Sequence, residues 1–132
     1  NFFLAIAQTF EDTGVRAYKG QAGNLSGNAT VLTAALSIHS VEARHAAHIR
    51  SMRRAIGELG ATAALKPWIT LNQSGIATSA VNASYAGEEL TTQANVNVAA
   101  LGDIGANSAS EAFDEPLTME QVLPIAGLFI QS

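Results

Sequence analysis

Glu42-Ala43-Arg44-His45 places a carboxylate and an imidazole three residues apart, so that in a helix both side chains share one face. Stepping outward from this tetrapeptide by fours and threes traces the rest of that face. Its other six positions are all apolar: Val31, Ala35, Ile38, Ile49, Met52 and Ile56. A carboxylate in an apolar interior is strongly unfavourable unless it is paired or bound to a cation. Glu42 and His45 therefore predict a polar site inside a helical interface, with a metal ion as the leading candidate partner.

The segment before it repeats this pattern from residue 1 to about residue 22. The same stepping gives a second face with one acidic position, Glu11, among small and apolar neighbours: Leu4, Ala7, Gly14 and Tyr18. The short stretch from Gly23 to Asn28 is rich in turn-forming residues and predicts a tight connection. A connection this short makes the two helices antiparallel neighbours. We predict the second helix to begin near Asn28 or Thr30 and to end near Gly57 or Gly60.

The rest of the chain changes character. Residues 61–112 are rich in Ala, Asn, Ser, Thr and Gly, and predict an irregular arm with one or two short strands around residues 94–98. A loop of this length is expected to wrap the helices or to contact a partner, with Trp68 as its anchor. Residues 113–132 predict a short helix that begins with a capping box of Thr118 and Gln121. Its apolar end packs on the helices or forms an assembly contact.

Charge is divided unevenly along the sequence. Seven basic and four acidic residues lie at or before Lys66, and seven acidic and no basic residues follow it. The acidic part is expected to lie over the basic end of the helical pair, or the two parts are separately solvated faces. Asp12 and Arg16, four residues apart, predict a surface ion pair. Three arginines near the end of the second helix complement its dipole and, without an aromatic platform, disfavour nucleic-acid binding: Arg50, Arg53 and Arg54.

The composition of the chain excludes several kinds of site and segment. The chain has 132 residues and no cysteine, which excludes disulfides and thiolate metal sites. No run of residues is long and apolar enough for a membrane span. The compartment stays open: no signal peptide is visible, and a chain without its true start could be cytoplasmic or exported.

Four stretches resemble a bacterial family of ferritin-like domain proteins that is related to plant desiccation-related proteins. They are residues 10–20 (FEDTGVRAYKG), 38–45 (IHSVEARH), 66–69 (KPWI) and 113–118 (FDEPLT). The resemblance implies an all-α, ferritin-like helical bundle, of which residues 1–60 form a two-helix half. Residues 61–112 would be a wrapping arm and residues 113–132 a short terminal helix. Family members carry two earlier helices, so the other half of the bundle would come from missing preceding chain, which the abrupt start favours, or from a second copy.

The resemblance also implies a function. Ferritin-like bundles hold a di-metal centre with a Glu from each of two helices and a Glu-x-x-His from each of the others, which matches Glu11, Glu42 and His45 here. His39 and Tyr18 are possible second-layer residues around them. Oxygen and nitrogen donors favour iron or manganese, with zinc possible. The protein would then oxidise iron or detoxify peroxide in stress protection. Alternatively, the three residues form a metal-free hydrogen-bond network in a structural or accessory subunit of a larger assembly, so whether it is an enzyme stays open.

Overall fold

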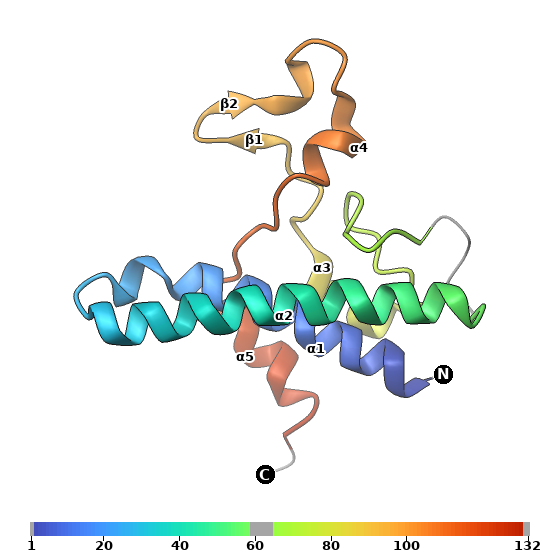
Figure 1. Ribbon diagram of the computed structural model, residues 1–132, viewed down its shortest axis with the longest axis horizontal. Helices are drawn as coiled ribbons and strands as arrows, with labels where there is room; N and C mark the ends of the chain where they lie inside the picture. Colours follow the sequence, from blue (N-terminus) through green and yellow to red (C-terminus); the bar gives the residue numbers. More distant parts are fainter. Residues whose placement is uncertain (1, 59–64, 131–132) are drawn as a thin grey trace.

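A hairpin of two long helices forms the base of the molecule. The structure is a computed structural model that describes residues 2–58 and 65–130. Helix α1 (Phe2–Gln21) and helix α2 (Ala29–Ala55) lie side by side, and the 3-10 turn η1 (Gly23–Leu25) reverses the chain between them (Figure 1). The predicted antiparallel hairpin is therefore confirmed. None of the described helices is both long enough and apolar enough to cross a membrane.

The ends of α2 follow from its sequence. Asn28 is the N-cap, and its side chain accepts a hydrogen bond from the Val31 backbone N–H at 3.1 Å. Such a cap satisfies one of the amide groups that the first turn leaves unpaired. At the other end Gly57 has a φ of +60°, a conformation that glycine adopts without strain and that commonly ends helices. The predicted start near Asn28 and the predicted end near Gly57 are confirmed. The predicted boundary at residue 60 lies outside the described residues.

The arm lies on one side of the hairpin and consists of short elements (Figure 1). In chain order they are η2 (Ser79–Val81), α3 (Asn82–Tyr85), β1 (Thr92–Gln93), β2 (Val96–Asn97), η3 (Val98–Ala100) and α4 (Gly105–Ser110). Strands β1 and β2 pair antiparallel, and positive φ angles at Ala94 and Asn95 turn the chain between them. Helices account for most of the described residues, which confirms the all-α prediction.

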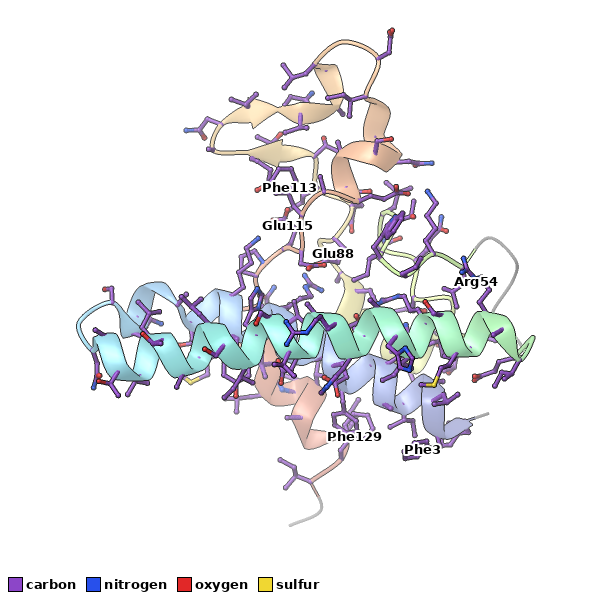
Figure 2. The ribbon with its side chains drawn as sticks, in the orientation of Figure 1. Phe3, Arg54, Glu88, Phe113, Glu115 and Phe129 are labelled. Carbon is purple, nitrogen blue, oxygen red and sulfur yellow. The ribbon has the colours of Figure 1, made fainter. Side chains whose placement is uncertain are left out.

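Helix α5 (Met119–Gly127) lies on the side of the hairpin opposite the arm (Figure 1). Its predicted capping box is confirmed: the Thr118 side chain accepts from the Gln121 backbone, and the Gln121 side chain accepts from the Thr118 backbone. Beyond the helix, the Phe129 ring packs against Phe10 of α1 with ring centroids 4.5 Å apart. Figure 2 shows Phe129 and Phe3 on this side, with Glu88 and Glu115 on the arm side. The apolar end of the chain thus contacts the hairpin.

The interface between hairpin and arm is the most strongly buried part of the described structure, and it is unusually polar. Its apolar members include Leu65, Ile69 and Leu117, whereas Trp68, the predicted anchor, is 50% exposed. The largest fully buried side chains are instead three arginines: Arg16, Arg50 and Arg53. Charged residues are rarely buried without a partner. These arginines must therefore be paired inside the interface.

The prediction of a surface ion pair between Asp12 and Arg16 is wrong. Asp12 is 3% exposed and Arg16 is 1% exposed, because the arm covers this face of α1. Asp12 pairs with Arg50 of α2, and Arg16 pairs with Glu88 of the arm. Arg50 and Arg53 lie near the C-terminal end of α2, as predicted, and both are buried. The spacing within one helix could not show which face the distant arm would cover.

Candidate metal site and the buried network beside it

Two of the three predicted metal ligands meet across the hairpin. Glu11 comes from α1, and Glu42 and His45 come from α2. His45 Nδ1 lies 3.3 Å from Glu11 Oε1, a distance at which a hydrogen bond forms when one of them carries the proton. The side chain of His45 is 56% exposed and that of Glu11 is 26% exposed. The structure thus brings this carboxylate and this imidazole together at an open edge of the hairpin.

The third residue, Glu42, lies against α1 at the position of a glycine. A Cβ atom built on Gly14 would be 2.6 Å from Glu42 Oε2 and 2.7 Å from Glu42 Oε1, closer than atoms can approach. Only a glycine at position 14 leaves room for the carboxylate in this position. Gly14 thereby sets where the Glu42 carboxylate lies, next to the pair of Glu11 and His45.

The surroundings of Glu42 disfavour its negative charge. Burial raises the pKa of Glu42 above its usual value, the nearby Glu11 raises it further, and His45 lowers it. Glu42 Oε2 is buried and has no hydrogen-bond partner among the described residues. A buried acceptor of this kind normally has a partner. A cation or a hydrogen-bond donor beside Glu42 would therefore be stabilising.

The three side chains do not yet make a complete metal site. Within residues 2–58 and 65–130, no group of three or more His, Cys, Asp or Glu side chains is close enough together to hold a metal ion. The donor types fit iron or manganese, because they are carboxylate oxygens and an imidazole nitrogen. One Glu and one Glu-x-x-His are also half of the donor set that a di-metal bundle requires. The residues present thus fit half of such a centre.

His39 and Tyr18 were predicted to lie in a second layer around the metal ligands. His39 Nδ1 lies 2.9 Å from the backbone carbonyl oxygen of Val15, so this ring nitrogen is directed at α1 and not at Glu42. Tyr18 lies on α1 two turns after Glu11 and is partly buried. These observations do not test whether His39 or Tyr18 acts around a metal ion, so both roles stay predictions.

The same face of α2 carries apolar side chains that the described chain leaves uncovered. Val31 is 44% exposed, Ile38 is 43% exposed and Ile56 is 58% exposed, whereas Ala35 and Ile49 are buried. Val31 and Ile38 lie near one end of α2 and Ile56 lies at the other, so these side chains are spread along the helix and do not form one contiguous patch. The hairpin therefore satisfies only part of its apolar face by itself.

A buried polar network that the sequence analysis missed lies on the arm side of the hairpin. The Asp12 carboxylate accepts hydrogen bonds from Arg50 Nη1 at 2.7 Å, from Arg50 Nη2 at 2.5 Å and from the Tyr85 hydroxyl at 2.6 Å. Gln8 joins the network by donating to the Tyr85 hydroxyl oxygen and accepting from Arg53 Nη1. Burial raises the pKa of Tyr85, and the Asp12 carboxylate raises it further. The tyrosine is therefore a neutral donor.

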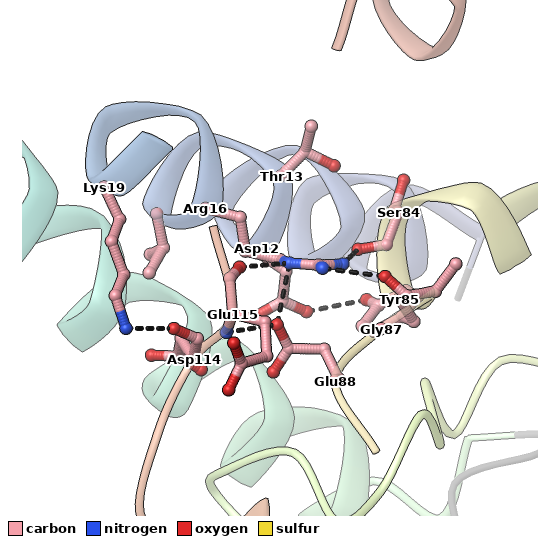
Figure 3. Close-up of polar contacts among 12 residues, drawn as sticks. Asp12, Thr13, Arg16, Lys19, Ser84, Tyr85, Gly87, Glu88, Asp114 and Glu115 are labelled. Atoms are coloured by element: carbon pink, nitrogen blue, oxygen red, sulfur yellow. Dashed lines mark hydrogen bonds and ion pairs between the residues drawn. The ribbon is translucent and has the colours of Figure 1, made fainter. Parts of the chain in front are cut away.

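Arg16 joins α1 to the arm through four groups (Figure 3). It donates to the backbone carbonyl oxygens of Ser84, Ala86 and Glu115 at 2.6–2.8 Å. Its Nε atom also lies 2.7 Å from Glu88 Oε1. Because a guanidinium group has five N–H donors in a fixed plane, one arginine can hold several segments at once. Arg16 thus fixes α3 and the start of the last segment on α1.

Opposite charges connect the basic hairpin to the acidic arm. Besides Arg16 with Glu88, Lys66 Nζ lies 2.5 Å from Glu111 Oε1, and Lys19 donates to the backbone carbonyl oxygen of Asp114. Of these three contacts, Arg16 with Glu88 is the ion pair between hairpin and arm, because Lys66 belongs to the arm itself and Lys19 contacts a backbone carbonyl group. At the basic end of α2, Arg50 pairs with Asp12 and Arg53 with Glu58, so the expected cover of that end by the acidic part stays a prediction.

These features define a class: an all-α protein whose helical hairpin carries a Glu on one helix and a Glu-x-x-His on the other. Comparison with family models gives one match, in which residues 1–55 match the family described as Ferritin-like domain. The matched range covers α1 and α2 and contains Glu11, Glu42 and His45. The match supports a ferritin-like hairpin over residues 1–55 of the 132-residue chain. Comparisons with curated proteins and with solved structures gave no match.

Proposed function

We propose that Glu11, Glu42 and His45 form one half of a carboxylate-bridged di-metal centre that binds iron or manganese. The observation that carries this proposal is the position of Glu42. Its buried Oε2 has no hydrogen-bond partner among the described residues, and it lies beside the pair of Glu11 and His45. A positive ion at this point would balance the charges of the two carboxylates, and Glu42 Oε2 could bind it as a ligand. Oxygen and nitrogen donors can also bind zinc, but they favour iron or manganese.

The other half of the centre would come from preceding chain or from a second copy of this chain. Two such halves supply the four carboxylates and two histidines that ferritin-like di-metal bundles use. The exposed apolar residues Val31, Ile38 and Ile56 support the need for a covering half. Bound iron or manganese would supply reactivity toward oxygen or peroxide. The function would be iron oxidation or peroxide detoxification in stress protection, as implied by the resemblance to bacterial, desiccation-related members of the family.

Replacing Glu42 with alanine is expected to abolish stoichiometric metal binding. The purified chain is loaded with Fe(II) without oxygen, and in parallel with Mn(II) and Zn(II), and bound metal per chain is counted by native mass spectrometry. The same spectra show whether two copies associate. Glu89→Ala, which changes an exposed glutamate of the arm, is the matched control and should bind like the unaltered chain. Equal metal content in Glu42→Ala and in the control would contradict the proposed site.

Replacing Gly14 with alanine is expected to weaken metal binding while the fold is retained. The new methyl group would occupy the space of the Glu42 carboxylate, which lies at the end of a flexible side chain and can move away. Alanine also favours a helix over glycine by about 1 kcal/mol, so the free energy of unfolding should change little. Native mass spectrometry gives the metal content and chemical denaturation gives the stability. Full metal binding by a stable Gly14→Ala variant would show that the position of Glu42 does not matter.

A second candidate function is that of a structural or accessory subunit without metal chemistry. It is favoured by the contact between Glu11 and His45, in which each side chain already has a partner. In this case Fe(II), Mn(II) and Zn(II) would bind weakly and without dependence on Glu42. The metal measurement above therefore decides between the two functions.

A further inference from the structure

A cavity of about 180 Å³ lies between α1 and α5, on the side of the hairpin away from the arm (Figure 1). Gly14 and Ala17 line it from α1 and Ala126 lines it from α5, and these side chains are too short to fill the space. An apolar cavity of about 150 Å³ engineered into another protein binds benzene or xenon. The space between α1 and α5 is therefore large enough for one small ring.

The lining of this cavity offers no free polar side chain. None of the described residues that line it is charged. Its two polar side chains, Thr9 and Thr13, donate their hydroxyl protons within α1, to the backbone carbonyl oxygens of Ala5 at 2.9 Å and of Thr9 at 2.7 Å. A buried water molecule typically makes about three hydrogen bonds, so a lining of this kind favours an apolar occupant over water.

The cavity has a buried floor and an aromatic wall. Thr9 is 3% exposed and Ile125 is 6% exposed. The rings of Phe10 and Phe129, which also line the cavity, pack against each other with an angle of 53° between their planes. Figure 2 shows Phe129 at this side of the hairpin. Because aromatic rings attract one another in tilted and offset arrangements, this pair favours a third ring as a neighbour.

We propose that this cavity binds a single apolar aromatic ring, such as benzene or a small benzene derivative. The ring would lie between Ala17 and Ala126, with Phe129 at one side. Gly14 borders both the cavity and the Glu42 carboxylate, so the ligand would lie near the proposed metal site. Binding of the ring requires no metal, and neither proposal depends on the other.

Titration of the purified chain with fluorobenzene, followed by fluorine NMR and without added metal, tests the proposal. We expect saturable binding with a dissociation constant that is roughly millimolar or lower. Benzene should compete, and bound benzene should show nuclear Overhauser contacts to the methyl groups of Ala17, Val122 and Ile125, which line the cavity. A response that does not saturate, or contacts only to methyl groups elsewhere, would overturn the proposal.

Four variants test which side chains recognise the ring. Ala126→Leu should fill the space and lower the affinity about tenfold or more, whereas Ala34→Leu, at an exposed position of α2, should not change it. Phe129→Leu keeps an apolar side chain and should lower the affinity about two- to tenfold, the loss of one ring contact. Phe3→Leu changes an exposed phenylalanine outside the cavity and is its control.

Unchanged affinity in Ala126→Leu would place the binding elsewhere and refute the proposal. Unchanged affinity in Phe129→Leu would refute the preference for an aromatic ring. If circular dichroism shows that Ala126→Leu does not fold, the Overhauser contacts in the unaltered chain still decide where benzene lies.

Discussion

Replacing Asp12 with alanine is expected to lower the free energy of unfolding by roughly 3–5 kcal/mol, the usual effect of breaking a buried ion pair from one side. Asp12 accepts two hydrogen bonds from Arg50 and one from the hydroxyl of Tyr85, and all three side chains are almost fully buried. Without Asp12 the guanidinium group of Arg50 would remain in the interface with no charged partner of its own. Urea denaturation followed by circular dichroism measures the change.

Two further variants distinguish the contribution of the ion pair to stability from that of a single hydrogen bond and from that of side-chain packing. Tyr85→Phe removes one hydroxyl and should lower the stability by only about 0.5–1.5 kcal/mol, the range for a single hydrogen bond. The double variant Asp12→Leu with Arg50→Met replaces the ion pair by apolar groups. It should recover much of the loss, because apolar pairs of similar size often substitute for buried ion pairs. A loss below about 1 kcal/mol in Asp12→Ala would mean that this interface does not hold the arm in place.

The sequence predicted the local elements well. The spacing of apolar residues predicted α1 and α2, the residues Asn28 and Gly57 predicted the ends of α2, and the residues Thr118 and Gln121 predicted the start of α5. Each of these signals acts over a few neighbouring residues, so the chain itself contains the information. The same reasoning could not predict contacts between residues about 70 positions apart, such as those of Asp12 with Tyr85 and Arg16 with Ser84.

For the candidate metal site, the sequence predicted which residues would be close together but not how completely they are covered. Periodicity placed Glu11, Glu42 and His45 on facing sides of two helices, and the structure brings Glu11 and His45 within 3.3 Å. Periodicity also assigned an interior position to His45, which is more than half exposed. Burial depends on what packs over the hairpin, and a repeat within one helix carries no information about that. The buried arginines were missed for the same reason.

The charged side chains on the two sides of the hairpin are paired differently, which indicates different roles for the two sides. On the arm side each buried arginine has a carboxylate or carbonyl partner, so these charges hold the arm in place. On the other edge Glu11 and Glu42 have one histidine between them and no arginine or lysine in an ion pair within the described residues. An excess of negative charge at a partly buried site is favourable only if a cation or proton is bound there. The asymmetry therefore supports metal binding at Glu42 and a structural role for the arginines.

Glu88 is expected to make the attachment of the arm dependent on pH. Burial raises the pKa of Glu88 from its ordinary value of 4.5 to about 7, outweighing the opposite effects of Arg16 and of the Glu115 backbone N–H. Between these two pH values the folded protein keeps a proton that the unfolded chain releases, so stability falls as the pH rises through this window. The stabilisation is fully present below pH 4.5 and lost above about pH 7. The shift corresponds to roughly 3 kcal/mol at 1.36 kcal/mol for each pH unit.

Glu88→Gln should remove this dependence, because glutamine stays neutral and still offers an oxygen to Arg16 and to the Glu115 backbone N–H. The difference in unfolding free energy between the unaltered chain and this variant should therefore fall by roughly 3 kcal/mol from pH 4.5 to just above pH 7. Glu42, whose pKa is also raised, is not among the groups that shift the pKa of Glu88, so it acts equally in both proteins and cancels. The negative charge of Asp114 raises the pKa of Glu88, so Asp114 is part of the measured difference. Glu89→Gln changes the exposed neighbouring residue and should follow the unaltered chain at every pH. Parallel curves for Glu88→Gln and the unaltered chain would show that Glu88 stays ionised when the arm is attached, so that its pairing with Arg16 outweighs its burial.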